Sequence, residues 1–320
     1  MELSFAPLEG ITYSLYRTAH AQFFGGADLY YAPFISPDCE GRIKPSAIRE
    51  LLPENNEGIK LVPQLLCSRP EVFINAAREL RSMGFEEINL NAGCPSGTVV
   101  SKFKGSGMLR DIEQFDNFLN EVFSVLDGEI SVKTRLGMTD REEFQALMEI
   151  YRKYPLSKLI VHARTRAGMY KSRTDAQIIK TCASDLPYRL IYNGDVFSKS
   201  AEERVCTMLS PDGLMLGRGA LANPALFREL RGGEALRAGE LKAFHDALVE
   251  VYLASGLAPN YTIARMKELW FYMLYMFPTC GRLGKEILKS RTLPDYKAAV
   301  SNLFASGSFD ASFGFSQPLI

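Results

Sequence analysis

The sequence lacks an excess of charge of either sign. Its 37 lysines and arginines balance 37 aspartates and glutamates, and the isoelectric point is near 6.8. A protein that binds nucleic acid through its overall charge is strongly basic. The balance excludes that class, so any contact with a polyanion must come from local basic patches.

Metal-binding and disulfide patterns are also missing. The chain has six cysteines and three histidines, and no two cysteines form a C-x-x-C pair. Zinc sites and disulfide frameworks need closely spaced Cys and His residues. We therefore expect neither a metal site nor disulfides, as is usual for a protein of the reducing cytoplasm.

Long apolar runs are absent as well. The longest, residues 269–278, is about ten residues long and too short to cross a bilayer. The N-terminus shows no basic segment followed by an apolar one, as a signal peptide would. These absences predict a cytoplasmic protein without membrane contact. No pattern indicates a protein partner, so we expect a monomer.

The sequence does contain a regular alternation of short apolar runs and helical segments. Apolar residues make up 47% of the chain, enough for a large core. Residues 70–83, 111–126, 140–154 and 198–209 have helical spacing. Eight alternating units of this kind predict a closed (β/α)8 TIM barrel, with an open doubly wound sheet as the alternative. The eight candidate strands are residues 3–6, 29–32, 60–65, 87–90, 130–134, 158–162, 189–192 and 213–216.

The composition changes after the last candidate strand. Residues 231–240 are polar and rich in glycine, and only amphipathic helical patterns follow them. We place a domain boundary near residue 235. This predicts a barrel domain over residues 1–235 and a small helical domain over residues 236–320.

Polar residues and glycines stand at the ends of nearly all candidate strands. In a barrel, chemistry belongs to the C-terminal ends of the strands and to the loops after them. A purely structural barrel would not need polar residues there. The candidates are residues 7–10, Gln64, residues 89–95, Lys133, Arg135, His162, Arg164, residues 193–195 and residues 217–219.

The loops after the last two strands have the composition of a phosphate site. They read Asn193-Gly194-Asp195 and Gly217-Arg218-Gly219. Glycine lets backbone N–H groups approach an anion, and barrels often build a phosphate site from these two loops. Either tripeptide by itself could be an ordinary turn, but two on adjacent strands favour phosphate binding.

Three single residues are unusual where they stand. Lys133 is a cation inside an apolar strand, so it needs an anion, either a structural carboxylate or a negatively charged cofactor group. His162 could be a core histidine, but it ends a strand beside Arg164, which favours function. Cys94 lies in a Gly-Cys-Pro turn, where the thiol is exposed. It could be a small core residue or a proton donor, and no nearby histidine favours a nucleophile.

Two segments supply the local basic patches that the neutral total leaves open. Residues 158–173 contain five cations and no carboxylate, and residues 261–297 contain seven cations and three carboxylates. Tyr170, Trp270, Tyr272 and Tyr275 lie among them. Such runs are either solvated faces or surfaces that bind and stack on nucleic acid.

The order and spacing of these segments resemble one family closely, the tRNA-dihydrouridine synthases, which are flavin enzymes that reduce uridine in RNA. The resemblance runs through nearly the whole chain. It is carried by Ala6-Pro-Leu-Glu-Gly, Val62-Pro-Gln-Leu, Asn89-Leu-Asn-Ala-Gly-Cys-Pro, Val132-Lys-Thr-Arg-Leu-Gly, Val161-His-Ala-Arg-Thr, Tyr192-Asn-Gly-Asp and Leu216-Gly-Arg-Gly-Ala-Leu-Ala-Asn-Pro. The sequence departs from the family at Leu8, where methionine is commoner, at residues 104–108, and in its zero net charge.

The resemblance implies an FMN-binding barrel followed by a helical domain that binds tRNA. Cys94 would be the catalytic proton donor. Asn91, Arg164 and Tyr170 would contact the RNA. The residues that would hold FMN are Pro7, Leu8, Glu9, Gln64, Lys133, His162, Asn193, Gly194, Asp195, Gly217 and Arg218.

The implied reaction uses NADPH to reduce FMN and then transfers hydride to C6 of an extruded uridine, while Cys94 protonates C5. An unperturbed thiol is mostly protonated at neutral pH and therefore suits an acid. Two alternatives stay open. One is an FMN-dependent oxidoreductase of the dihydroorotate dehydrogenase type that acts on a small molecule, and the other is a dihydrouridine synthase that acts on another structured RNA.

Overall fold

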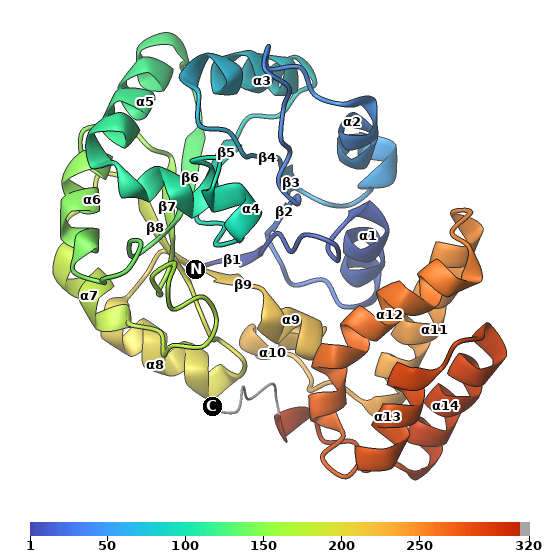
Figure 1. The fold of residues 1–320 in the computed structure, drawn as a ribbon. Coiled ribbons are helices and arrows are strands. Elements are labelled where there is room, and N and C mark those ends of the chain that lie inside the picture. The colour runs from blue at the N-terminus through green and yellow to red at the C-terminus, as the bar shows by residue number, and fades with distance from the viewer. Residues whose placement is uncertain (314–320) are drawn as a thin grey trace.

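The barrel is built from nine parallel strands in one sheet, which the computed structural model describes within residues 1–313 (Figure 1). The hydrogen-bonded order is β3-β2-β1-β9-β8-β7-β6-β5-β4. The two ends of this order, β3 and β4, are separated in the chain only by Pro63, so the sheet closes on itself. The strands are β1 (Glu2–Phe5), β2 (Leu29–Tyr31), β3 (Leu61–Val62), β4 (Gln64–Leu65), β5 (Ile88–Ala92), β6 (Ile130–Arg135), β7 (Lys158–His162), β8 (Arg189–Asn193) and β9 (Gly213–Leu216).

The closed barrel is confirmed, and the open doubly wound sheet is wrong. Each of the eight predicted strands is present, and the third is divided in two at Pro63. Proline has no N–H, so it cannot donate to the ladder at that position. Its carbonyl oxygen still accepts from the N–H of Asn89 at 3.0 Å, which keeps the two halves in the wall of the barrel.

The helices of the barrel surround the strands, because the strands are buried on both faces and need cover on the outside. Several begin at capping side chains: Asp111 accepts from Gln114 N–H, and Ser198 accepts from Ala201 N–H. The helices are α1 (Ser14–Phe23), α2 (Pro45–Leu51), α3 (Pro70–Ser82), α4 (Gly97–Val100), α5 (Ile112–Val125), α6 (Glu143–Tyr151), α7 (Ala176–Cys182), α8 (Lys199–Leu209), α9 (Arg218–Ala222) and α10 (Leu226–Leu230). Short 3-10 helices, η1 (Pro53–Asn55) and η2 (Gly105–Arg110), lie between them.

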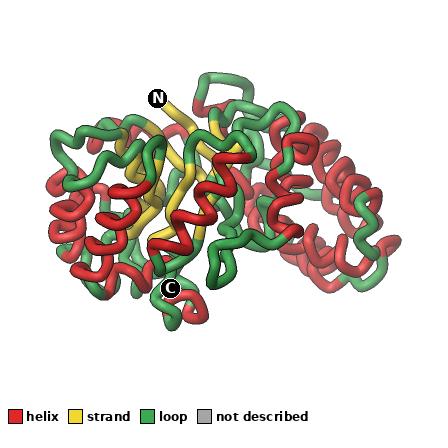
Figure 2. The backbone as a smooth tube through the Cα atoms, turned by 90° about the horizontal axis from the view of Figure 1, so that it is seen from above, coloured by secondary structure: helices red, strands yellow, loops and turns green. Residues whose placement is uncertain are grey.

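A group of helices follows the barrel and packs beside it (Figure 2). Trp270 and Tyr296 are fully buried in this group, and the Trp270 indole N–H donates to the Tyr296 hydroxyl at 2.8 Å. Phe244 packs against Tyr16 and Phe24 of the barrel with ring centroids 6.0 and 5.0 Å apart. The elements are α11 (Ala238–Ala254), α12 (Pro259–Met273), η3 (Leu274–Met276), α13 (Gly281–Lys289), α14 (Leu293–Ser306) and η4 (Ala311–Phe313).

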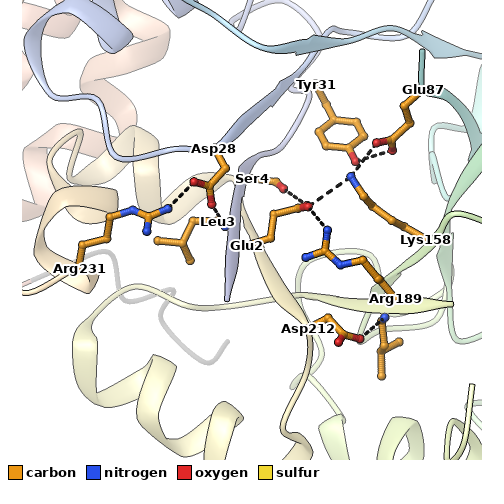
Figure 3. Close-up of polar contacts among 11 residues, drawn as sticks. Glu2, Leu3, Ser4, Asp28, Tyr31, Glu87, Lys158, Arg189, Asp212 and Arg231 are labelled. Carbon is orange, nitrogen blue, oxygen red and sulfur yellow. Dashed lines mark hydrogen bonds and ion pairs between the residues drawn. The ribbon is translucent and has the colours of Figure 1, made fainter. Parts of the chain in front are cut away.

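The N-terminal end of the barrel carries a network of charged side chains (Figure 3). Lys158, at the start of β7, lies 2.6 Å from a carboxylate oxygen of Glu87 and 3.3 Å from one of Glu2. The Tyr31 hydroxyl donates to Glu87, and Arg189 binds Glu2. These contacts serve stability, since barrel chemistry sits at the opposite end of the strands. Lys158 therefore does not belong to a basic surface patch.

None of the helices in residues 1–313 combines the length and the apolar composition that a membrane span requires.

Candidate functional site

A cavity of about 290 Å³ opens at the C-terminal ends of the strands. Every predicted site residue lines it except Arg164. The lining comes from β4, β6, the C-terminal ends of β5, β7, β8 and β9, and the loops after β1, β2, β5, β7, β8 and β9. Residues far apart in the sequence therefore meet there. The predicted residues that line it are Pro7, Leu8, Glu9, Gln64, Asn91, Cys94, Lys133, His162, Tyr170, Asn193, Gly194, Asp195, Gly217 and Arg218.

Lys133 faces this cavity, and its ionisable neighbours among the described residues are Arg135 and Cys94 rather than a carboxylate. Burial, together with the nearby charge of Arg135, lowers the pKa of its ammonium group to about 7. A lysine held in this way is stabilised in its charged form by any anion that enters. The structural ion pair that could have explained Lys133 is therefore not present in residues 1–313.

His162 is buried beside Lys133 and is held in its neutral form. Burial lowers its pKa well below the ordinary value, and the charges of Arg135, Lys133, Arg164 and Arg218 act in the same direction. Four cations therefore surround one neutral ring. This side of the cavity has an electrostatic preference for a negatively charged ligand.

Asp195 joins the loops after β7, β8 and β9. Its carboxylate oxygen Oδ1 accepts from Arg218 at 2.6 Å and from Arg164 at 3.0 Å, and Arg164 also binds Oδ2. Its backbone has a φ of +41°, and the preceding Gly194 has a φ of +148°. The carboxylate is thus committed to two arginines, so an anion would meet the backbone of this loop and the Arg218 side chain rather than the Asp195 carboxylate.

Arg164 lies behind the cavity wall. It is 3% exposed, and besides Asp195 it donates to the carbonyl oxygen of Ser172 at 2.6 Å. Contact of Arg164 with RNA stays a prediction. In the structure its hydrogen bonds to Asp195 position the loop after β8, which the sequence predicts to bind phosphate.

A chain of amide side chains shapes the opposite wall. Asn91 donates to Gln64 at 2.7 Å, and Gln64 donates to Asn89 at 2.6 Å. The side-chain oxygen Oδ1 of Asn91 accepts from the backbone N–H groups of Gly93 and Cys94 at 3.1 and 2.9 Å. Asn91 therefore both lines the cavity and holds the turn on which Cys94 is presented.

Cys94 is partly buried on that turn. Burial raises the pKa of its thiol, although a hydrogen bond from the backbone of Ser96 and the charges of Lys133 and Arg135 oppose the shift. The thiol is therefore protonated at neutral pH. Residues 105–109 are buried behind it, and the Ser106 hydroxyl donates to the carbonyl oxygen of Cys94 at 2.8 Å. This segment supports the turn.

Tyr170 lies over the cavity among cations. Its ring centroid is 4.9 Å from the guanidinium carbon of Arg218, 5.4 Å from that of Arg135 and 5.7 Å from the His162 ring. Its side chain is still 41% exposed. A flat aromatic ring that is open to solvent at a cavity mouth is suited to stacking on a planar ligand.

Other residues also line the cavity, among them Arg135, a strand-end candidate to which the sequence assigns no role, and Tyr272, which the sequence places in a basic stretch. Arg135 donates to the carbonyl oxygens of Gly93 and Thr165, so it ties the Cys94 turn to the loop after β7. Tyr272 reaches the cavity from α12, in the helices after the barrel. The end of the fifth candidate strand, which is β6 in the structure, points to Arg135. No sequence pattern identifies Tyr272 as a cavity residue, because its approach depends on how α12 packs.

The basic patches are smaller than the sequence predicts. Lys158 is bound at the far end of the barrel, and Trp270 is fully buried rather than available for stacking. Lys171 and Arg173 are exposed in the loop after β7, and Lys285, Lys289 and Arg291 are exposed in the C-terminal helical part of the chain. Among the described residues no cluster of Cys, His, Asp and Glu is suited to hold a metal ion.

A parallel barrel with a cation-lined cavity and a protonated thiol at its C-terminal rim has the arrangement of a barrel enzyme. Residues 4–254 match the family described as dihydrouridine synthase (Dus). The chain therefore belongs to the dihydrouridine synthase family.

Relatives with assigned names agree with this family. The chain is 29% identical over 316 residues to tRNA-dihydrouridine synthase B of Pseudomonas putida, covering 95% of this chain and 90% of the relative. It is 26% identical over 275 residues to a probable tRNA-dihydrouridine synthase of Rickettsia bellii, covering 83% and 84%.

Solved structures resemble the chain in fold alone. A mutant of morphinone reductase in complex with tetrahydroNAD has a TM-score of 0.53 at 13% identity and covers 76% of this chain and 90% of that one. A variant of NCR from Zymomonas mobilis has a TM-score of 0.51 at 14% identity and covers 72% and 86%.

Proposed function

We propose that the protein reduces specific uridines in tRNA to 5,6-dihydrouridine, with FMN as its cofactor and NADPH as the source of hydride. The family identity supports an enzyme of the oxidoreductase class that acts on uridine in tRNA. The observation that carries the finer proposal is the placement of Lys133 and Cys94 on one cavity. A cation without a carboxylate partner lies there together with a protonated thiol.

The residues of the cavity fit FMN. Lys133 would face the edge of the ring system that carries negative charge in the reduced cofactor, and Gln64, His162 and residues 7–9 would line the ring. The backbone around Asn193, Gly194, Asp195 and Gly217, with the Arg218 guanidinium, would hold the phosphate. When it is bound, FMN supplies the hydride that reduces the pyrimidine at C6.

Cys94 supplies the proton for C5 in this proposal. A group that donates a proton must carry that proton at the operating pH. Burial raises the pKa of the Cys94 thiol and so favours its protonated form. The Asn91 side chain holds the Cys94 turn through the two backbone N–H groups it binds, so the backbone that carries the thiol is fixed beside the cavity. Asn91 also remains available at the cavity wall to orient the uracil edge.

Tyr170 would stack on the RNA near the extruded uridine, since the base must leave the helix to reach the cavity. The exposed cations of the C-terminal helices, within the proposed RNA-binding domain over residues 236–320, would contact the phosphate backbone. The barrel domain over residues 1–235 would carry the chemistry. We propose further that the protein works in the cytoplasm as a monomer.

Incubation of the protein with FMN, NADPH and a tRNA transcript that lacks modifications tests this function. The expected product is a transcript in which one or more uridines have gained two hydrogens, as detected by mass spectrometry of its nucleosides. If only another structured RNA is modified, the tRNA assignment is wrong. If the protein binds FMN but reduces no RNA, the activity of the dihydroorotate dehydrogenase type replaces this proposal.

A further inference from the structure

Helix α12 touches the barrel site at two points. Arg265 and Tyr272 are seven positions apart, which is about two turns of helix, so both lie on one face of α12. Tyr272 lines the cavity. Arg265 donates from Nη1 to the carbonyl oxygen of Gly10, in the segment that follows β1. That segment forms another wall of the same cavity.

The segment that Arg265 binds is folded tightly. The N–H of Leu8 donates to the Thr12 hydroxyl at 2.8 Å, and Gly10 has a φ of +86°, which glycine adopts without strain. The Tyr13 hydroxyl donates to a carboxylate oxygen of Glu9 at 2.8 Å. The guanidinium carbon of Arg265 lies 5.7 Å from the centroid of the Tyr13 ring. One arginine thus contacts both the backbone of the segment and the ring that holds Glu9.

The other polar contact of Arg265 is weaker. Its Nη1 lies 3.7 Å from a carboxylate oxygen of Glu268 on the same helix, and the two side chains are 38% and 51% exposed. Exposed pairs of this kind add little to stability, whereas a hydrogen bond from a charged donor is stronger than a neutral one. The bond to Gly10 is therefore the main polar tie between α12 and the segment after β1.

We propose that Arg265 is a positioning residue, which fixes residues 7–9 on the cavity wall by binding Gly10 and Tyr13. Pro7, Leu8 and Glu9 all line the cavity, so the C-terminal helices set the shape of the barrel site as well as flanking it. The effect on FMN rests on the proposed function, but the ordering of residues 7–13 by Arg265 does not. The charge of Arg265 suggests a role in RNA binding, but its contacts with Gly10 and Tyr13 direct its side chain toward the barrel instead.

The first test measures amide hydrogen exchange of residues 8–13 in the cofactor-free protein, since Pro7 has no amide hydrogen. Arg265→Ala should speed exchange in this segment about tenfold, as the loss of one charge-assisted hydrogen bond predicts, and Arg265→Lys should restore part of the protection. Arg282→Ala is the matched control, because Arg282 on α13 is 90% exposed and pairs only with Glu286 among the described residues. Unchanged exchange in Arg265→Ala, or faster exchange throughout the protein, would overturn the proposal.

The second test measures FMN binding and the visible spectrum of the bound flavin. Arg265→Ala should weaken FMN binding several-fold and shift the absorption bands, and Arg265→Lys should restore part of both, while Arg282→Ala matches the wild type. A wild-type protein that takes up no FMN would contradict the proposed function, and the exchange experiment would still decide the role of Arg265. Normal FMN affinity and an unshifted spectrum in Arg265→Ala would contradict the positioning of the cofactor wall.

Discussion

Arg218 and Asp195 are joined by a 2.6 Å ion pair that connects the loops after β9 and β8. Arg164 binds the same carboxylate from the loop after β7. Three neighbouring strand ends are therefore held by one side chain, at the place where the loops would receive the phosphate of FMN. The pair explains why an acidic residue lies in a site proposed to bind an anion. The Asp195 carboxylate orients the Arg218 guanidinium and does not itself contact the ligand.

Replacement of Asp195 by asparagine tests this arrangement. Asparagine tolerates the left-handed backbone at this position, so the loop should keep its path. It cannot hold two guanidinium groups as a carboxylate does, and we expect FMN to bind about tenfold more weakly, the effect of losing one charge-assisted hydrogen bond. Titration of FMN fluorescence measures the affinity. Tighter binding by the variant would mean that the carboxylate only repels the anion.

Replacement of Cys94 by alanine should separate reduction of the flavin from reduction of RNA. The variant should bind FMN and oxidise NADPH as the wild type does, because the thiol is not needed for either step. Dihydrouridine formation should fall by at least about 100-fold, the usual effect of losing a general acid. Nucleoside mass spectrometry after a fixed time provides the measurement. A variant that forms dihydrouridine at the normal rate would exclude Cys94 as the donor.

Lys133 predicts a pH dependence of FMN binding. In the free cavity its pKa is about 7, and an anion beside it raises that value. The charged form that binds best is therefore lost as the pH rises above about 7, and FMN affinity should fall, by at most about tenfold for each pH unit. The same shift makes the cofactor-free protein more stable as the pH rises above 7, because the unfolded chain still carries the proton.

The control for this prediction is Lys133→Met. Its FMN affinity should be lower at pH 6.5 and should vary little up to pH 8.5, since no group at this position titrates. Affinities measured at several pH values for both proteins give the comparison. A wild-type affinity that does not change with pH would show that Lys133 does not face the charged part of the cofactor.

The network at the N-terminal end of the barrel predicts a loss of stability without a loss of binding. Lys158→Met would leave Glu87 and Glu2 buried with one partner fewer, at a cost of about 3 kcal/mol. Lys153, which is exposed and pairs with the partly exposed Asp116, provides a control, and Lys153→Met should cost less than about 1 kcal/mol. Urea denaturation measures both. Equal effects of the two substitutions would contradict the structural role of Lys158.

The barrel could be predicted from the sequence because its strands are short, buried apolar runs separated by helical spacing. Gln64, Lys133 and His162 could be placed at the site because strand ends of a parallel barrel converge. The break at Pro63 follows from the missing N–H of proline, but the hydrogen bonds that keep the wall intact at that point depend on the neighbouring strand.

The sequence wrongly assigned Lys158 and Trp270 to basic surface patches, and the two errors have one physical cause. Residues that are close along the chain need not be close in space. Lys158 and His162 are four positions apart on β7, and a strand rises about 3.3 Å per residue, so about 13 Å separates them. One belongs to the stabilising end of the barrel and the other to the cavity. Trp270 stands in a basic stretch, yet it points into the core of the C-terminal helices. Arg265 and Tyr272 reach the barrel only through helix packing that no local pattern encodes.

The most direct test of the proposed function follows the flavin without oxygen. The protein is loaded with FMN, reduced with one equivalent of NADPH, and then mixed with a tRNA transcript that lacks dihydrouridine. We predict that NADPH bleaches the visible bands and that the transcript restores them, with dihydrouridine formed in proportion. A flavin that stays reduced with the transcript but is reoxidised by a small pyrimidine such as orotate would contradict the account.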